Sequence, residues 1–203
     1  MTKPAVFQIK KLPMDIGRVL LALVMVPAYR VKKIITPGVS FKNIYGAVIA
    51  ANHQSFSDPL IINSCFWYRR VHFVVGEAVM TGFREKLLRQ TGCIKIRRGL
   101  ADLDGIKKCM EVTKSGWPLA MFPEGSLESE SLKGGVVLVA AKTDVPIIPA
   151  YIEKRKNVFK MTRVHFGEPI YPKDYCKKSL PTKQETDEIL KVLAERYQKL
   201  KES

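Results

Sequence analysis

A histidine and an aspartate five positions apart carry the clearest chemistry in the sequence. Residues 52–59 read NHQSFSDP and follow an apolar run at 47–51 that predicts a buried strand. Asp58 followed by Pro59 is typical of a helix start, because Asp is a good N-cap and Pro fits the first helical position. His53 would then lie on a strand-to-helix turn, where the Asp58 carboxylate can fold back onto one imidazole nitrogen. Such an imidazole can act as a general base, although a polar turn histidine beside a capping aspartate fits the same stretch.

Three further short stretches place polar residues beside apolar runs. They are residues 92–99 (GCIKIRRG), 122–126 (FPEGS) and 145–150 (VPIIPA). Together with residues 52–59, in this order and at this spacing, they resemble the glycerolipid acyltransferase family, whose best-known members are the lysophosphatidic acid acyltransferases. The resemblance covers about residues 43–170.

The resemblance rests on individual positions in four sequence blocks. The matching positions are Asn52, His53 and Asp58 in the first block, Gly92 and Arg98 in the second, Phe122 to Gly125 in the third, and Val145 and Pro146 in the fourth. Ser126 is a conservative replacement for the threonine of the family, whereas Leu127 stands where the family usually has an arginine.

The resemblance implies direct transfer of an acyl group from a thioester to a hydroxyl, without a nucleophilic side chain. His53 would take the hydroxyl proton, and Asp58 would fix the imidazole tautomer and stabilise the imidazolium. Arg98 occupies the phosphate-binding position of the family, and its guanidinium suits a phosphomonoester. Glu124 falls in the acceptor site of the family, and Lys95 is a further candidate substrate contact beside Arg98.

The loop after the third block contributes the remaining candidates. Gly125 permits close approach of the backbone, and the amides near Ser126 are candidate donors to the oxyanion. Leu127 cannot bind phosphate, so either the acceptor has a less charged headgroup or another cation replaces the missing arginine. Lys133, on the same loop, is the expected replacement.

The expected function is therefore acylation of a lysophospholipid, with 1-acylglycerol 3-phosphate as the leading acceptor. The co-substrate is expected to be acyl-CoA or an acylated acyl carrier protein, with no metal and no other cofactor. Two alternatives stay open: transfer to another lipid or amine acceptor, and a catalytically silent membrane-binding homologue.

The charge balance points to anionic partners. Lys and Arg outnumber Asp and Glu by 34 to 19, for a formal charge of +15, which favours a membrane surface or an acidic carrier. We expect no nucleic-acid partner, because the aromatic residues do not interleave with basic ones in an RNA-binding motif. The four cysteines lack short paired spacings and are expected to be reduced thiols.

An apolar segment near the N-terminus indicates membrane association. Residues 19–29 are apolar but too short for a span, which takes about 20 residues. Arg18 on one side and Arg30, Lys32 and Lys33 on the other suit a helix at 14–33 that lies in the interface with its basic ends at the headgroups. We therefore expect a peripheral or monotopic protein on the cytoplasmic face of a membrane.

The remaining sequence predicts a single α/β domain. Strands are expected at about 45–51, 71–75, 93–97, 118–122, 147–152 and 163–166. Helices are expected at 59–67, 81–90, 101–115, 134–142 and 182–200. This alternation predicts a mixed, mostly parallel sheet flanked by helices. We expect the chain to consist of an N-terminal membrane-associating segment at 1–38 and the α/β domain at 39–203.

Overall fold

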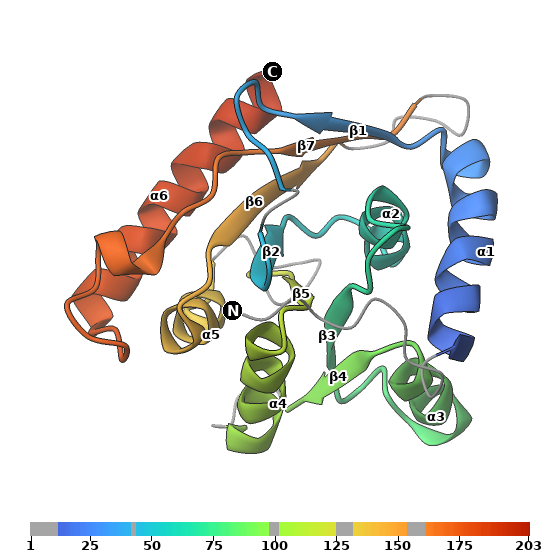
Figure 1. Cartoon of the computed structure of the whole chain (residues 1–203), viewed down its shortest axis with the longest axis horizontal. Helices are drawn as coiled ribbons and strands as arrows, with labels where there is room; N and C mark the ends of the chain where they lie inside the picture. Colours follow the sequence, from blue (N-terminus) through green and yellow to red (C-terminus); the bar gives the residue numbers. More distant parts are fainter. Residues whose placement is uncertain (1–11, 42–43, 98–101, 125–131, 154–160) are drawn as a thin grey trace.

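The computed structural model describes residues 12–41, 44–97, 102–124, 132–153 and 161–203. In these residues a seven-stranded sheet has the order β1-β7-β6-β2-β5-β3-β4 (Figure 1). The strands are β1 Lys32–Ile35, β2 Ala47–Ala51, β3 His72–Gly76, β4 Cys93–Ile96, β5 Pro118–Met121, β6 Ile147–Ile152 and β7 Arg163–Phe166. Each pairing is parallel except that of β6 with β7. The predicted mixed, mostly parallel sheet is confirmed.

The centre of the sheet consists of β2 between β5 and β6. All five residues of β2 are buried, as are all four of β5, which is the pattern of parallel strands covered on both faces. Ile49 of β2 pairs with Ala120 of β5 and with Ile148 of β6. Because these three strands run in the same direction, the segments that leave their carboxyl ends meet at one edge of the sheet.

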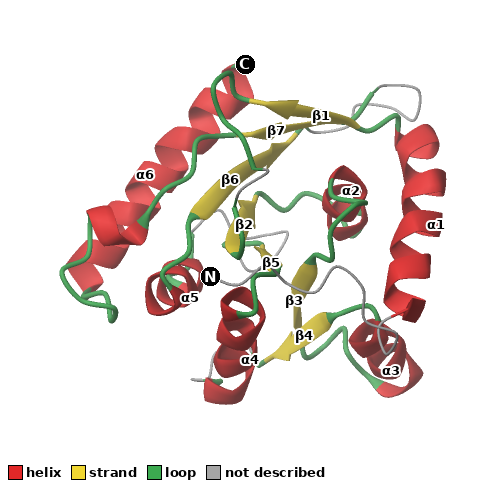
Figure 2. Cartoon of the chain, viewed as in Figure 1, coloured by secondary structure: helices red, strands yellow, loops and turns green. Residues whose placement is uncertain are grey.

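Helices cover both faces of the sheet (Figure 2). They are α1 Leu12–Tyr29, α2 Asp58–Cys65, α3 Gly82–Gln90, α4 Leu103–Lys114, α5 Gly135–Thr143 and α6 Lys183–Glu202, with a short 3-10 helix, η2, at Pro172–Asp174. Helices α4, α5 and α6 contribute to the apolar core on one face, and α2 contributes to the core on the other. Helix α1 packs against α2, and α3 lies beside β4 without a buried residue of its own.

The N-terminal helix is shorter than the sequence predicted. The helix expected to extend to residue 33 ends at Tyr29, and Arg30 has a positive φ of 47°. Residues 32–35 instead form β1, whose Lys33 pairs with Val164 of β7. The helix stops there because the following backbone finds its hydrogen-bond partners on a distant strand. The division at residue 38 stays a prediction, and β1 lies in the same sheet as the strands that follow it.

Lys33 turns inward rather than toward the headgroups expected for it. Its ammonium lies 4.0 Å from the centre of the Phe66 ring. It also donates a hydrogen bond of 3.3 Å to the carbonyl of Cys65, the last residue of α2. A cation at the C-terminal end of a helix is favourable, so Lys33 stabilises the helix that begins at Asp58.

A buried ion pair fastens α1 to the domain. Arg70, whose side chain is 0% exposed, donates from Nε to Asp15 Oδ1 over 2.8 Å and from Nη2 to Asp15 Oδ2 over 2.5 Å. Its guanidinium also lies 5.1 Å from the centre of the Trp117 ring. In the part of the chain that the structure describes, no helix is long and apolar enough to span a bilayer.

Candidate active site

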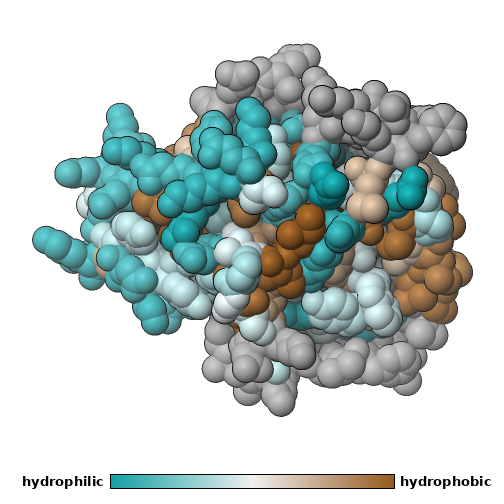
Figure 3. All heavy atoms as spheres, turned by 90° about the horizontal axis from the view of Figure 1, so that it is seen from above, coloured by the Kyte–Doolittle hydropathy of each residue, from teal (hydrophilic) through white to brown (hydrophobic). Residues whose placement is uncertain are grey.

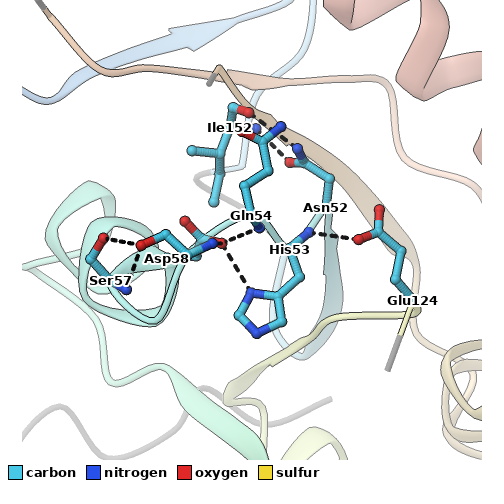
Figure 4. Close-up of polar contacts among 8 residues, drawn as sticks. Asn52, His53, Gln54, Ser57, Asp58, Glu124 and Ile152 are labelled. Atoms are coloured by element: carbon cyan, nitrogen blue, oxygen red, sulfur yellow. Dashed lines mark hydrogen bonds and ion pairs between the residues drawn. The ribbon is translucent and has the colours of Figure 1, made fainter. Parts of the chain in front are cut away.

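His53 and Asp58 meet at the carboxyl end of β2, as the sequence predicted. His53 Nδ1 lies 2.9 Å from Asp58 Oδ2, and the two side chains are 15% and 2% exposed (Figure 4). This geometry suits a tautomer in which Nδ1–H donates to the carboxylate and Nε2 presents its lone pair. The pair therefore has the arrangement of a general base and its orienting acid.

The same carboxylate oxygen also holds the backbone of the turn. Asp58 Oδ2 accepts from the amide of Gln54 at 2.6 Å and from the amide of Ser55 at 2.7 Å. The predicted capping role is wrong by one residue: Ser57 is the N-cap and makes no side-chain cap bond, and Asp58 lies in the first turn of α2. The carboxylate points toward the preceding turn, where it gains hydrogen bonds from two backbone amides and the imidazole. A capping position would give it a hydrogen bond from only a helix amide.

The imidazole is supported from a second strand. The His53 ring stacks on Phe122, which follows β5, with ring centres 4.3 Å apart and an interplanar angle of 27°. The ring is thus fixed by a hydrogen bond at Nδ1 and by packing on one face. The sequence marked Phe122 as a family position but did not predict this contact.

Asn52 joins the carboxyl ends of β2 and β6. Its Nδ2 donates to the carbonyl of Ile152 at 3.1 Å, and its Oδ1 accepts from the Ile152 amide at 2.7 Å (Figure 4). The side chain is 5% exposed, and it extends the ladder where the two strands separate. Asn52 therefore fixes the point at which the chain leaves the sheet for the turn at residues 53–58, which carries the candidate catalytic pair.

Glu124 also acts on this turn. Its Oε2 accepts a hydrogen bond of 3.0 Å from the backbone amide of His53, so the segment after β5 braces the segment after β2. Tyr151 of β6 lies close by: burial raises the pKa of its phenol, a hydrogen bond to Gln54 opposes this shift, and the charges of Glu153 and Glu124 add to it. The phenol therefore stays neutral beside the turn.

A sequence profile described as acyltransferase matches residues 39–153, which is more than half of the chain. The chain belongs to the acyltransferase family. A chloroplastic 1-acyl-sn-glycerol-3-phosphate acyltransferase of Arabidopsis thaliana is 32% identical over 114 residues, which are 51% of this chain and 30% of the relative. The 1-acyl-sn-glycerol-3-phosphate acyltransferase of Streptococcus pneumoniae is 28% identical over 158 residues, which are 74% of this chain and 57% of the relative.

The fold of this acyltransferase is similar to a solved one. The crystal structure of the 1-acyl-sn-glycerophosphate acyltransferase of Thermotoga maritima aligns with a TM-score of 0.65 at 18% identity, covering 94% of this chain and 81% of the other. At this identity the likeness concerns the fold. The chain spans less than two thirds of the length of the curated relatives described above.

Several predicted substrate contacts of the acyltransferase lie outside the described residues. These are Arg98, Gly125 and Ser126, together with the departure at Leu127. Lys133 is described and exposed. Its backbone amide donates to the carbonyl of Pro123 at 2.8 Å. The backbone of Lys133 therefore lies beside Pro123, which precedes Glu124, in the part of the domain that holds His53.

Lys95 has protein partners instead of an open position. Its ammonium lies 3.2 Å from Glu85 Oε2 on α3 and 3.6 Å from Glu77 Oε1 after β3. A substrate phosphate would have to compete with two carboxylates for this cation. The role of Lys95 as a substrate contact stays a prediction, and its contacts in the structure join α3 to β4.

The cysteines of the acyltransferase are free thiols, as predicted. Burial raises the pKa of Cys65 and of Cys109 to about 12. A thiol at such a pKa is almost entirely protonated at neutral pH and is a poor nucleophile. These two residues are therefore unsuited to a covalent acyl intermediate.

Proposed function

We propose that this acyltransferase moves a fatty acyl group from a thioester to the free hydroxyl of a lysophospholipid. The leading acceptor is 1-acylglycerol 3-phosphate, which would give phosphatidic acid. The observation that carries the proposal is the His53–Asp58 pair, with Nδ1 held by the carboxylate at 2.9 Å. The choice of acceptor is supported by the two sequence relatives described above, which are 1-acyl-sn-glycerol-3-phosphate acyltransferases.

The proposed reaction is a single displacement. Nε2 of His53 removes the proton as the acceptor hydroxyl attacks the thioester carbonyl, and Asp58 stabilises the imidazolium. The tetrahedral intermediate collapses, the C–S bond breaks, and the thiolate takes the proton from His53. No nucleophilic side chain is needed, since the thiolate of a thioester is already a good leaving group.

Charge complementarity supports an anionic acceptor. Arg98 and Lys133 are proposed to bind its phosphate, in line with the excess of basic residues over acidic ones. The proposed donor is acyl-CoA or an acylated acyl carrier protein, both of which are anionic. We propose no metal and no further cofactor; in the described residues no cluster of three metal-binding side chains occurs.

The proposed place of action is the cytoplasmic surface of a membrane. Helix α1 exposes a large share of its apolar side chains to solvent, namely Ile16, Val19, Leu20, Leu23, Val24 and Val26. Figure 3 shows apolar residues gathered at the right-hand side of the molecule, where α1 lies in Figure 1. A helix of this kind suits the headgroup boundary of an anionic leaflet.

The test is an acceptor panel with product identification. The protein is incubated with labelled acyl-CoA or acylated carrier and with lysolipids that differ only in headgroup, and the products are identified by mass. We expect phosphatidic acid from lysophosphatidic acid with wild type, and its loss with His53→Ala. Transfer to a neutral lysolipid in preference to lysophosphatidic acid would contradict the proposed acceptor, and no transfer with any acceptor would contradict the activity.

A further inference from the structure

The catalytic turn carries an aromatic side chain that is exposed and rigidly mounted. Phe56 is 81% exposed, although it lies between the two members of the His53–Asp58 pair. Two backbone amides hold the turn by donating hydrogen bonds to Asp58 Oδ2. The amide of Asp58 itself donates a further hydrogen bond of 3.0 Å to the carbonyl of Ser55. A phenylalanine ring that loses its hydration gains a large free energy.

A second exposed apolar side chain follows Phe56 in the first turn of α2. Leu60 follows Phe56 by four residues and is 39% exposed, whereas Ile61 and Ile62 face the core. Phe56 and Leu60 therefore place two exposed apolar side chains at the N-terminal end of α2.

Helix α2, which follows Phe56, is in contact with α1. The α1 residues Leu20, Leu23 and Val24 are 57%, 67% and 63% exposed. The N-terminal end of α2 and the exposed apolar side chains of α1 thus belong to neighbouring segments on the same face of the sheet.

We propose that Phe56 and Leu60 are interfacial contacts, inserted into the lipid surface on which α1 lies. The catalytic turn then meets the acceptor at the boundary of the leaflet, and His53 is held at the depth of the acceptor hydroxyl. This inference rests on the membrane location in the proposed function and adds the turn as a second, independent point of insertion. The excess of Lys and Arg over Asp and Glu matches an anionic leaflet as the occupant.

The test places a fluorescent reporter in the turn. Phe56→Trp is made together with Trp67→Phe, which removes the exposed tryptophan of the chain and leaves the buried Trp117 as a constant background. The control is Leu103→Trp in the same background. Leu103 is 76% exposed but begins α4, which packs on the opposite face of the sheet. Leu60→Trp serves as a second reporter if the melting curve of Phe56→Trp differs from wild type.

Each protein is mixed with anionic vesicles whose acyl chains carry bromine, a short-range quencher of tryptophan. Sedimentation of the same samples reports binding separately. We expect the Phe56→Trp emission to fall by roughly half, since interfacial side chains enter about 5–10 Å into the leaflet, while the Leu103→Trp emission stays unchanged.

The outcomes separate the two proposals. Sedimentation without quenching of Phe56→Trp or Leu60→Trp overturns the inference and leaves the membrane location standing. Equal quenching of the reporter and Leu103→Trp indicates unspecific adsorption and also overturns it. Failure to sediment overturns the membrane location, and the inference with it, whereas acyl transfer to a dispersed acceptor in that case would keep the proposed chemistry.

Discussion

Two side-chain pairs of this protein, His53–Asp58 and Arg70–Asp15, have similar contact distances but different surroundings. In the first pair the carboxylate is 2% exposed and the imidazole 15% exposed. In the second pair the guanidinium is 0% exposed and the carboxylate 12% exposed. The first pair joins residues five apart, whereas the second joins residues 55 apart on different elements. One pair leaves its base accessible, and the other encloses its cation.

The difference separates a pair that is proposed to act in catalysis from a pair that joins two elements of the fold. Two backbone amides donate hydrogen bonds to the Asp58 carboxylate, so the position of this carboxylate does not depend on its contact with His53 alone. Arg70 depends on Asp15 for both of the bonds described here, and its Nη1 is buried without a hydrogen-bond partner among the described residues. Loss of a partner should therefore slow turnover at the first pair and lower the free energy of unfolding at the second.

The largest expected effect is on turnover in His53→Ala. General base catalysis contributes about 10²–10⁴-fold, so we expect a loss in this range with an unchanged melting curve. Steady-state rates with a saturating acceptor measure it. Ser57→Ala is the matched control, since Ser57 lies in the same turn and its hydroxyl contacts only Ser55 among the described side chains. Near-normal turnover in folded His53→Ala would refute the mechanism.

Asp15→Ala is expected to lower the free energy of unfolding by about 3–5 kcal/mol, because it leaves a buried guanidinium without its partner. Urea denaturation measures this loss. The double variant Asp15→Leu with Arg70→Met should recover most of the stability. If Asp15→Ala is as stable as wild type, the pair does not hold α1, and the comparison between the two pairs fails.

Glu124→Ala is expected to lower the turnover number by roughly tenfold, because a hydrogen bond to a charged group is worth about 1.5–3 kcal/mol. Glu124→Gln keeps an acceptor for the His53 amide and should lose less than about threefold if bracing is the main role. Equal and large losses in both variants would instead mean that the charge of Glu124 acts on the substrate. Measuring the Michaelis constant for each substrate separates these cases.

The smallest expected effect is that of Lys33→Met. This change keeps the apolar stem but removes the cation from the Phe66 ring and from the end of α2, for a loss of about 1 kcal/mol. Lys32→Met on the same strand is the control, since Lys32 is exposed. Thermal melting of the two variants gives the comparison, and equal melting temperatures would show that the inward position of Lys33 contributes no stability.

The sequence predicted those features that depend on neighbouring residues. The His53–Asp58 contact is local, and the apolar runs at β2, β5 and β6 are bounded by turn residues, so both could be found from pattern alone. The unpredicted contacts are distant in sequence: Asn52 and Ile152 are 100 residues apart. The strand β1 was missed for the same reason. Its sequence, Lys-Lys-Ile-Ile, lacks the alternation of polar and apolar residues that indicates a strand, and its hydrogen-bond partner β7 is distant in the sequence.

The pairing of β1 with β7 also sets an order in time. Thr36, the residue after β1, donates a hydrogen bond to the carbonyl of Phe166, which is 130 residues later in the chain. At about 5–20 residues per second, ribosomal synthesis needs on the order of 7–26 s to reach that partner. Helix α1 therefore leaves the ribosome long before the strand that follows it can join the sheet, and its apolar residues are available to a chaperone or a bilayer throughout that delay.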